Sequence, residues 1–340
     1  MGWWQIDADT LARSRFVLSP LAETFACLQL MHRGEAAHPG EQAWLRTHLP
    51  PYRALLAADP LTARLVRAGL GRWGSPRVSA VERGGWIADF LAPTPRDGES
   101  IEEGLARVRA TDPVQARADV VVALQGAPLP AGLHRDDLPE RAADLLTHVW
   151  TEAVRPYWNR RRHILRADVV ARTAQVSQGG WASVLDSLRP GRSRWLGENR
   201  LQVNLHEYPP RDISGAELVF VPVTPKAGWV SWEEPERYAL VYTCAGALAD
   251  PTARPAPASL AALLGPARAA ALVLLGSPMS TSQLTAVTGQ GLGSVGRHLK
   301  VLLDAGLVER RRAGRSVLYS RTPAGDVLVE AQDRPGTRRS

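Results

Sequence analysis

The segment from Asp250 to Ser259 constrains the architecture of this chain most. It runs DPTARPAPAS and places three prolines within ten residues. Proline has no backbone N–H and disfavours a helical residue before it, so no helix or central strand is expected to cross this segment. We predict a semi-rigid linker over residues 250–258. It separates a domain of residues 1–249 from a C-terminal domain of residues 259–333, which a disordered basic tail follows over residues 334–340.

The excess of positive charge lies almost entirely after this linker. Residues 261–340 contain 11 Arg and Lys against 5 Asp and Glu, a net charge of +6, while the whole chain carries +7. A basic segment attached to an electrically balanced remainder is the footprint expected for a polyanion partner. The tail after residue 333 holds three of these arginines. It explains only part of the excess, because an arginine-rich stretch also occupies residues 310–315.

The first domain is expected to be helical to about residue 190. Apolar residues recur there at three- and four-residue spacing, which is typical of amphipathic helices. Such patterns cover residues 18–31, 60–70, 101–124, 138–150, 164–176 and 181–188, with Gly179-Gly180 separating the last two. Shorter β-prone runs follow at residues 201–205, 218–223 and 240–243. They predict a mixed β region over residues 195–246.

Glycines and prolines divide the C-terminal domain into short elements. Leu260 to Leu275 predicts one apolar-rich helix, ended by Gly276-Ser277-Pro278. A short helix follows, with N-cap candidates at residues 280–282, apolar Leu284 and Val287, and an end at Gly289. These elements predict the first half of a helix-turn-helix.

A second helix and a hairpin complete the pattern. The helix has a predicted core face and ends at Gly306, as a left-handed C-cap would. That face comprises Leu292, Val295, Leu299, Leu302 and Leu303. Residues 307–312 and 315–320 predict two strands around a turn at Ala313-Gly314, and Thr322-Pro323 begins a last helix. The order helix, tight turn, helix, basic hairpin is that of a winged helix-turn-helix. The predicted fold class is therefore mainly α with a small β region, a helical N-terminal domain followed by a winged helix-turn-helix.

Polar residues on the outer face of the second helix and on the hairpin predict an interface with double-stranded DNA. The second helix of such a motif enters the major groove, and the hairpin meets phosphates. We include His298 among the predicted DNA-binding residues, although its spacing from Val295 favours a half-buried packing role. The predicted DNA-binding residues are Ser294, Arg297, His298, Lys300, Arg311, Arg312 and Arg315.

Three stretches of the C-terminal domain resemble an ArsR/SmtB-type regulator over roughly residues 259–330. They read LLGPARAAALVLL, STSQLTAVTG and SVGRHLKVLLDAGLVERRRAGRSVLYSRTPAG. The resemblance implies DNA-binding transcriptional regulation, usually repression. It also implies a homodimer, with the first and last helices of the domain as the seam. RSRFVLSPLAE, GGW and Leu240-Val241-Tyr242 resemble an uncharacterised domain found ahead of such winged helices.

The chain departs from that family in its second helix. Gly291, Gly293 and Gly296 stand where Ser or Thr is usual. Each glycine inside a helix costs about 1 kcal/mol relative to alanine. The departure predicts a looser helix with fewer hydroxyl contacts to phosphate, and hence DNA affinity below the family norm or a helix ordered by DNA.

The same glycines also form GxGxxG, with Glu309 18 residues beyond the first. This is the strongest indication of an enzyme, because a dinucleotide-binding fold places a ribose-binding carboxylate at about that distance. The fold also requires a strand directly before the motif and further βα units after it. Residues 283–288 make a poor strand, and only 31 residues follow Glu309. We therefore favour the winged helix and predict no enzymatic activity.

Other candidate sites carry weaker signals. The metal-sensing members of the resembled family use thiolates or His and carboxylate pairs, whereas the first helix here has no cysteine and the last has no histidine. We predict no metal and no cofactor. Cys27 and Cys244 are expected in the core, and His206-Glu207 lacks the HExxH spacing. The run Arg160-Arg161-Arg162 is predicted as a solvated helix face, with an anion or DNA-backbone contact as the alternative.

All eleven tryptophans lie before residue 233. Most are expected in the core, with a ligand pocket as the alternative for some of them. The charge balance of residues 1–260 indicates that this domain was not added for DNA affinity, and we predict that it senses something other than a metal. The tryptophans suit an apolar or aromatic molecule, but they suit plain packing or a surface for a partner protein equally well. The first ten residues lack a signal-peptide pattern and no apolar run reaches about 18 residues, which predicts a cytoplasmic protein.

The function predicted from the sequence is sequence-specific transcriptional regulation. The expected protein is a homodimeric repressor that is not a typical metal sensor and has a possible small-molecule effector. The alternative is an enzyme or ligand-binding or protein-interaction module whose winged helix does not contact DNA.

Overall fold

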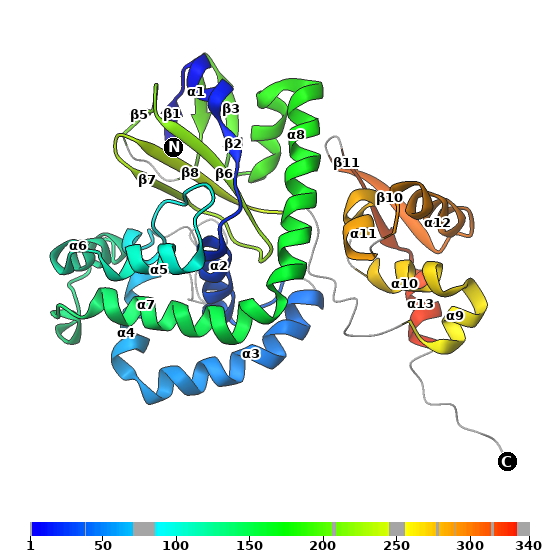
Figure 1. The fold of residues 1–340 in the computed structure, drawn as a ribbon, viewed down its shortest axis with the longest axis horizontal. Helices are drawn as coiled ribbons and strands as arrows, with labels where there is room; N and C mark the ends of the chain where they lie inside the picture. The colour runs from blue at the N-terminus through cyan, green and yellow to red at the C-terminus, as the bar shows by residue number, and fades with distance from the viewer. Residues whose placement is uncertain are drawn as a thin grey trace.

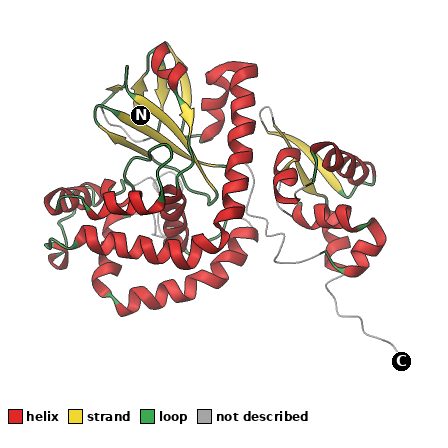
Figure 2. Ribbon diagram, in the orientation of Figure 1, coloured by secondary structure: helices red, strands yellow, loops and turns green. Residues whose placement is uncertain are grey.

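The computed structural model describes residues 2–37, 39–70, 86–205, 209–244, 256–276, 279–288, 290–313 and 316–331. Helices and a pair of small sheets form an N-terminal part, and a smaller helical part with its own sheet follows (Figure 1). Figure 2 shows that helix dominates both parts. Most of the predicted linker lies outside the described residues, which resume at residue 256.

The N-terminal part is built largely of helices. In chain order they are α1 (Ala8–Arg13), α2 (Pro20–Arg33), α3 (Pro39–Ala58), α4 (Pro60–Gly69), α5 (Ile101–Arg109), α6 (Pro113–Ala123), α7 (Leu138–Val149) and α8 (Trp158–Leu188). Short turns η2 (Asp89–Leu91), η3 (Ala131–Leu133), η4 (Trp150–Val154) and η5 (Arg155–Tyr157) connect some of them.

Local sequence sets where these helices begin. Ser19 caps α2 by accepting a hydrogen bond from the Ala22 amide, and Pro20 occupies the first turn. Ser100 and Glu103 form a complete capping box at α5. The predicted helix over 101–124 is two helices, because Pro113 starts α6 and Asp112 caps it. Gly180 has φ +69° and interrupts α8 at the predicted glycine pair.

The strands assemble into two four-stranded sheets. One has the order β2-β6-β8-β7 and the other β3-β4-β1-β5. Their bounds are β1 (Trp3–Gln5), β2 (Arg15–Phe16), β3 (Arg194–Gly197), β4 (Arg200–Gln202), β5 (Arg211–Asp212), β6 (Glu217–Val223), β7 (Val230–Glu233) and β8 (Arg237–Thr243). The predicted β-prone runs correspond to β4, β6 and β8. Strands β1 and β2 were not predicted, and they bring N-terminal residues into both sheets.

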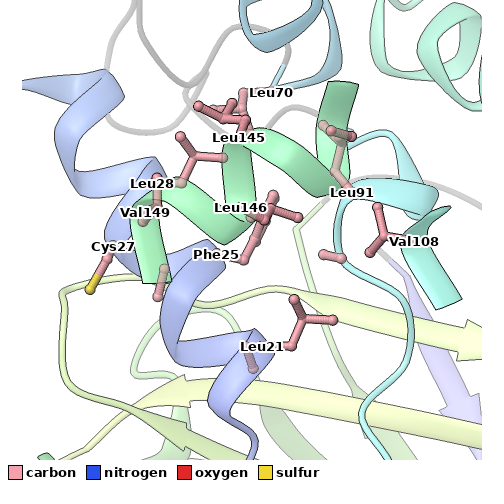
Figure 3. Packing of buried hydrophobic residues seen from close by; sticks show 14 of the residues in the cluster. Leu21, Phe25, Cys27, Leu28, Leu70, Leu91, Val108, Leu145, Leu146 and Val149 are labelled. Carbon is pink, nitrogen blue, oxygen red and sulfur yellow. The ribbon is translucent and has the colours of Figure 1, made fainter. Parts of the chain in front are cut away.

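The central strands β6 and β8 run parallel and are buried on both faces. Successive side chains of a strand point to opposite faces. Val219 and Val221 accordingly join the helical core of α2 to α7, while Leu218 and Phe220 join a second core with Trp4 and the second sheet. Figure 3 shows the helical core, in which Leu21, Phe25 and Leu28 of α2 lie beside Leu145, Leu146 and Val149 of α7. The sheet therefore has no solvated face at its centre.

The C-terminal part contains the predicted helix-turn-helix and hairpin. Its elements are α9 (Ala258–Leu264), α10 (Pro266–Leu274), β9 (Met279–Ser280), α11 (Thr281–Thr288), α12 (Leu292–Asp304), β10 (Val308–Ala313), β11 (Ser316–Arg321) and α13 (Pro323–Ala331). The predicted single helix over 260–275 is divided at Gly265-Pro266. Gly265 has φ +82°, which favours glycine, and Pro266 begins the next helix. Gly306 has φ +68°, as predicted for a left-handed cap.

The two parts of the chain touch through α8 and α11. Val287 of α11 packs against a small buried cluster formed by Ile164 and Leu165 of α8 with Cys244. In Figure 1, α11 is the helix of the C-terminal part that lies nearest to α8. This contact is apolar.

Candidate nucleic-acid interface

The first helix of the motif, α11, starts with a capping box. The Ser280 hydroxyl accepts a hydrogen bond from the Gln283 amide at 3.3 Å, and the Gln283 side-chain oxygen accepts one from the Ser280 amide at 2.6 Å. Leu284 of the same helix is buried in the C-terminal core. The capping box and the buried Leu284 side chain fix the direction of α11. The direction of α11 in turn limits where α12 can begin.

The second helix, α12, buries one face and exposes the other. Val295, Leu299 and Leu302 are buried in the core, as predicted, and Leu303 is half-buried. Leu292 was predicted on the core face, and this prediction is wrong because its side chain is 57% exposed. It lies in the first turn of α12, before the helix reaches the core. The first turn therefore presents an apolar side chain outward.

The charged residues predicted for α12 do lie on its outer face. Arg297 and Lys300 are both exposed. Ser294 and His298 are half-buried, and the Ser294 hydroxyl is 3.2 Å from Nε2 of His298. The two residues are one helical turn apart, so their side chains can meet on the surface of α12. Arg297 is the residue next to His298 in the sequence. The half-buried position of His298 agrees with the packing role that its spacing favoured.

The three glycines of α12 are not explained by close packing. A Cβ atom added to Gly291, Gly293 or Gly296 would meet no atom within 4 Å. Gly291 is the N-cap with an extended backbone at φ −67°, a conformation open to other residues. The three glycines therefore leave the first two turns of α12 without side chains at these positions, so another molecule could approach the backbone closely there.

The basic hairpin has a continuous register. β10 pairs with β11 from Val308 opposite Arg321 to Ala313 opposite Ser316. Alternation along β10 places Arg310 and Arg312 on the face that carries buried Val308, and Arg311 on the opposite face. Arg311 and Arg312 are both exposed, so the hairpin offers guanidinium groups from both faces. Arg315 lies outside the described residues.

The GxGxxG alternative does not have the structural context that it requires. The residues before it form helix α11, where a dinucleotide-binding fold needs a strand. Glu309 lies in β10, where it accepts a hydrogen bond from the Ser320 hydroxyl at 3.3 Å. The motif instead caps and begins α12.

The remaining candidates are distributed through the N-terminal part. Cys27 and Cys244 are buried, as predicted for core cysteines. His206 and Glu207 lie outside the described residues. Within the described ranges, the structure contains no group of three or more His, Cys, Asp or Glu side chains arranged to hold a metal ion.

The prediction of a solvated face for Arg160-Arg161-Arg162 is wrong for its central residue. Arg161 is fully buried, and its neighbours in the run are half-buried. The physical reason is a buried partner, the equally buried Glu23 of α2, whose carboxylate lies 2.5 Å from Nη1 of Arg161. The sequence gives no sign of this pair, since the two residues are 138 positions apart.

The comparisons with known proteins agree with the geometry of the C-terminal part. Residues 270–310 match the family model described as bacterial regulatory protein, arsR family. This match supports an ArsR-type helix-turn-helix in this segment, a class of domain that binds DNA. No curated protein and no solved structure matches the chain. The matched segment runs from the second half of α10 through β9, α11 and α12 to the start of β10. The resemblance of residues 1–249 to an uncharacterised domain stays a prediction.

None of the helices in the described part of the chain combines the length and apolar character needed to cross a bilayer.

Proposed function

We propose that this protein is a sequence-specific DNA-binding transcriptional regulator that acts as a repressor through a C-terminal winged helix-turn-helix. The observation that carries the proposal is α12, which buries Val295 and Leu299 while exposing Arg297 and Lys300. The basic strand β10 follows on the same small domain. A helix with this division of faces fits the major groove, and an adjacent basic hairpin fits the phosphates beside it. On this account the chain is a regulator and not an enzyme.

Arg297 is the residue we propose for base recognition. It is exposed on the helix, two residues from each of the buried Val295 and Leu299. Arginine commonly binds guanine through its paired N–H groups. Lys300, one turn further, is suited to a phosphate. Ser294 and His298 lie next to Arg297, where their hydrogen bond holds them in a shared position.

The arginines of the hairpin are proposed to bind phosphates. Such contacts add affinity without sequence information. Arg311, Arg312 and Arg315 form this set by prediction. Replacing any one with alanine should weaken binding evenly across sequences and lower the slope of log affinity against log salt by about one unit. An unchanged slope would place that residue away from the DNA backbone.

We further propose a homodimer. Leu263 of α9 and Val327 of α13 are each 65% exposed, although both helices contribute other side chains to the core. Two helices with uncovered apolar residues match the seam that the resemblance implies. Two-fold operators also require two recognition helices. Light scattering at micromolar concentration should give a dimer, and Val327→Lys should give a monomer. A wild-type monomer with and without DNA would contradict the proposal.

The N-terminal domain is proposed to sense a small molecule other than a metal ion. It has large cores of its own and holds all the tryptophans. It also touches the DNA-binding domain through α8 and α11. A ligand regulates DNA binding only if it binds the competent and incompetent states with different affinity. The contact supplies a physical route for that difference.

A mobility-shift assay tests the proposed function. Full-length protein is titrated against DNA from upstream of its own coding region, with a scrambled fragment of equal length as control. The proposal expects a discrete shift that competitor DNA of unrelated sequence does not remove. Equal binding to both fragments would contradict sequence-specific recognition.

A further inference from the structure

The stretch of α8 that meets the C-terminal part is strongly basic. Its first ten residues, 158–167, read WNRRRHILRA and contain four arginines and no acidic residue. Residues 1–260 together carry a net charge of only +1, which is the +7 of the whole chain less the +6 of residues 261–340. The near neutrality of the N-terminal part therefore conceals a local excess of positive charge.

One of these arginines is used inside the protein, and two others lie on the outer side of the helix. Arg161 is fully buried and paired with Glu23. Arg166 is exposed and Arg162 is half-buried, and the two lie one turn apart on the same side of α8. Neither member of this outer pair forms an ion pair with any residue in the described ranges. Their positive charge is therefore available to a partner.

The histidine of the same stretch is less suited to bind an anion. The Nδ1 atom of His163 lies 2.6 Å from the carbonyl oxygen of Asn159. A carbonyl oxygen only accepts hydrogen bonds, so Nδ1 carries the proton and the neutral ring has no second N–H group. The two outer arginines are therefore the groups that can donate to an anion here at neutral pH.

This pair of arginines lies close to the contact with the helix-turn-helix. Ile164 and Leu165 stand between Arg162 and Arg166 in the sequence, and Val287 of α11 packs against the cluster that they form with Cys244. Four residues of an α-helix rise by about 6 Å. Both arginines are therefore within one turn of the place where α8 and α11 meet, and Figure 1 shows α8 running beside the C-terminal part.

The helix on the other side of this contact has no charge of its own. Helix α11 reads TSQLTAVT, and no charged residue occurs from Met279 to Gln290. In helix-turn-helix complexes the first helix crosses the DNA backbone while the second lies in the major groove. Because α11 is the first helix here, it brings no cation to the phosphates that it crosses. The nearest cations on the neighbouring domain are those of α8.

We propose that Arg162 and Arg166 bind phosphates of double-stranded DNA beside the bases that α12 reads. The N-terminal part then extends the DNA-binding surface beyond the winged helix. Guanidinium groups bind phosphate oxygens through paired N–H groups, and such contacts add affinity without sequence information. This inference rests on the proposed function, because it requires α12 to lie in the major groove.

The salt dependence of DNA binding by the full-length protein tests the proposal. Fluorescence anisotropy gives the slope of log affinity against log salt on DNA from upstream of the coding region. The key variant replaces both arginines, Arg162→Gln with Arg166→Gln. It should lower the magnitude of the slope by about two units, since each lost phosphate contact removes about one. The double variant Arg162→Lys with Arg166→Lys keeps both charges and should keep the wild-type slope.

A matched control removes the same charge elsewhere. Arg64→Gln with Arg67→Gln replaces two exposed arginines of α4, which lies across the N-terminal part from α11 in Figure 1. This variant should keep the slope of the wild type. A second control shortens the DNA to the base pairs whose identity affects affinity. On that fragment the glutamine variant of α8 should differ less from the wild type, because the flanking phosphates are gone.

Three results would overturn the proposal. An unchanged slope in the glutamine variant of α8, with an unchanged melting temperature, would remove both arginines from the DNA. An equal loss in the α4 control would reduce the effect to net charge. An undiminished loss on the shortened DNA would contradict a contact with flanking phosphates. Failure of the proposed function is a separate result, in which the wild type binds its upstream DNA no more tightly than scrambled DNA.

Discussion

The N-terminal and C-terminal parts of this chain place their polar groups in opposite ways. The N-terminal part buries polar groups in pairs, such as Arg161 with Glu23 and Tyr242 with Asp168. The buried hydrophobic core of the C-terminal part consists of Ala, Leu, Val and Met side chains, while Arg297 and Lys300 face outward. The difference separates two tasks. Satisfied polar networks inside a protein rigidify and specify its core, whereas exposed cations on a simple core suit a polyanion.

The largest expected effect on stability follows from breaking a buried pair in the N-terminal part. Arg161→Ala leaves the Glu23 carboxylate buried without its cation, which costs about 3–5 kcal/mol in typical cases. Urea denaturation should show that loss in the free energy of unfolding. Arg166→Ala, at an exposed position of the same helix, should stay within about 0.5 kcal/mol of the wild type. Similar losses for both variants would contradict the distinction between buried and exposed arginines.

The corresponding change in the C-terminal part should affect DNA binding and not folding. Arg297→Ala removes an exposed side chain, so the free energy of unfolding should hardly change. Operator affinity should fall by about 1–3 kcal/mol, and discrimination at one base pair should relax. Binding measured by fluorescence anisotropy across single-base operator variants checks both statements. An unchanged preference at every position would remove Arg297 from base recognition.

Glycine gives a smaller test within the C-terminal part. Gly293→Ala adds a methyl group where nothing lies within 4 Å, so it should stabilise the domain by about 0.5–1 kcal/mol. Gly306→Ala makes the same change at φ +68° and should destabilise it. Thermal unfolding of the two variants provides the comparison. Destabilisation by Gly293→Ala would mean that the open surface of α12 is required by the fold.

The smallest expected effect is the pH dependence contributed by His48. Burial and the Arg161 guanidinium lower the pKa of His48 below its usual value of about 6.5. The folded state then binds fewer protons than the unfolded state near and below that value, so stability is lost as the pH falls through it. His48→Gln should flatten the decline in melting temperature between pH 7.5 and 5. An identical decline in the variant would contradict the lowered pKa.

The sequence predicted the C-terminal part better than the N-terminal part for a physical reason. The capping residues, the glycine C-cap and the hairpin lie within a few residues of what they control, so local spacing predicts α11, α12 and β10. One local signal was missed there, the break at Gly265-Pro266 that ends α9. Ser280 was among the predicted N-cap residues, but its capping box with Gln283 was not predicted, although the two residues have the local S-x-x-Q spacing.

The buried polar cluster around Arg161 in the N-terminal part depends on contacts between distant segments of the chain. Arg161 meets Glu23 across 138 positions and Thr224 across 63. No spacing rule connects such residues, and a run of three arginines ordinarily indicates a solvated helix face. Strands β1 and β2 were missed for the same reason, because each is two or three residues long and acquires its partners from residues beyond 195. Periodicity reports local structure and carries no information about these pairings.

The central claim is that the C-terminal domain recognises a particular DNA sequence. The most direct test measures the affinity of full-length protein for DNA from upstream of its own coding region and for scrambled DNA at the same physiological salt concentration. Specific regulators bind their sites about 10³-fold or more tightly than other DNA. We predict a ratio of that order, reduced by Arg297→Ala. A ratio near one, with or without that substitution, would contradict the claim.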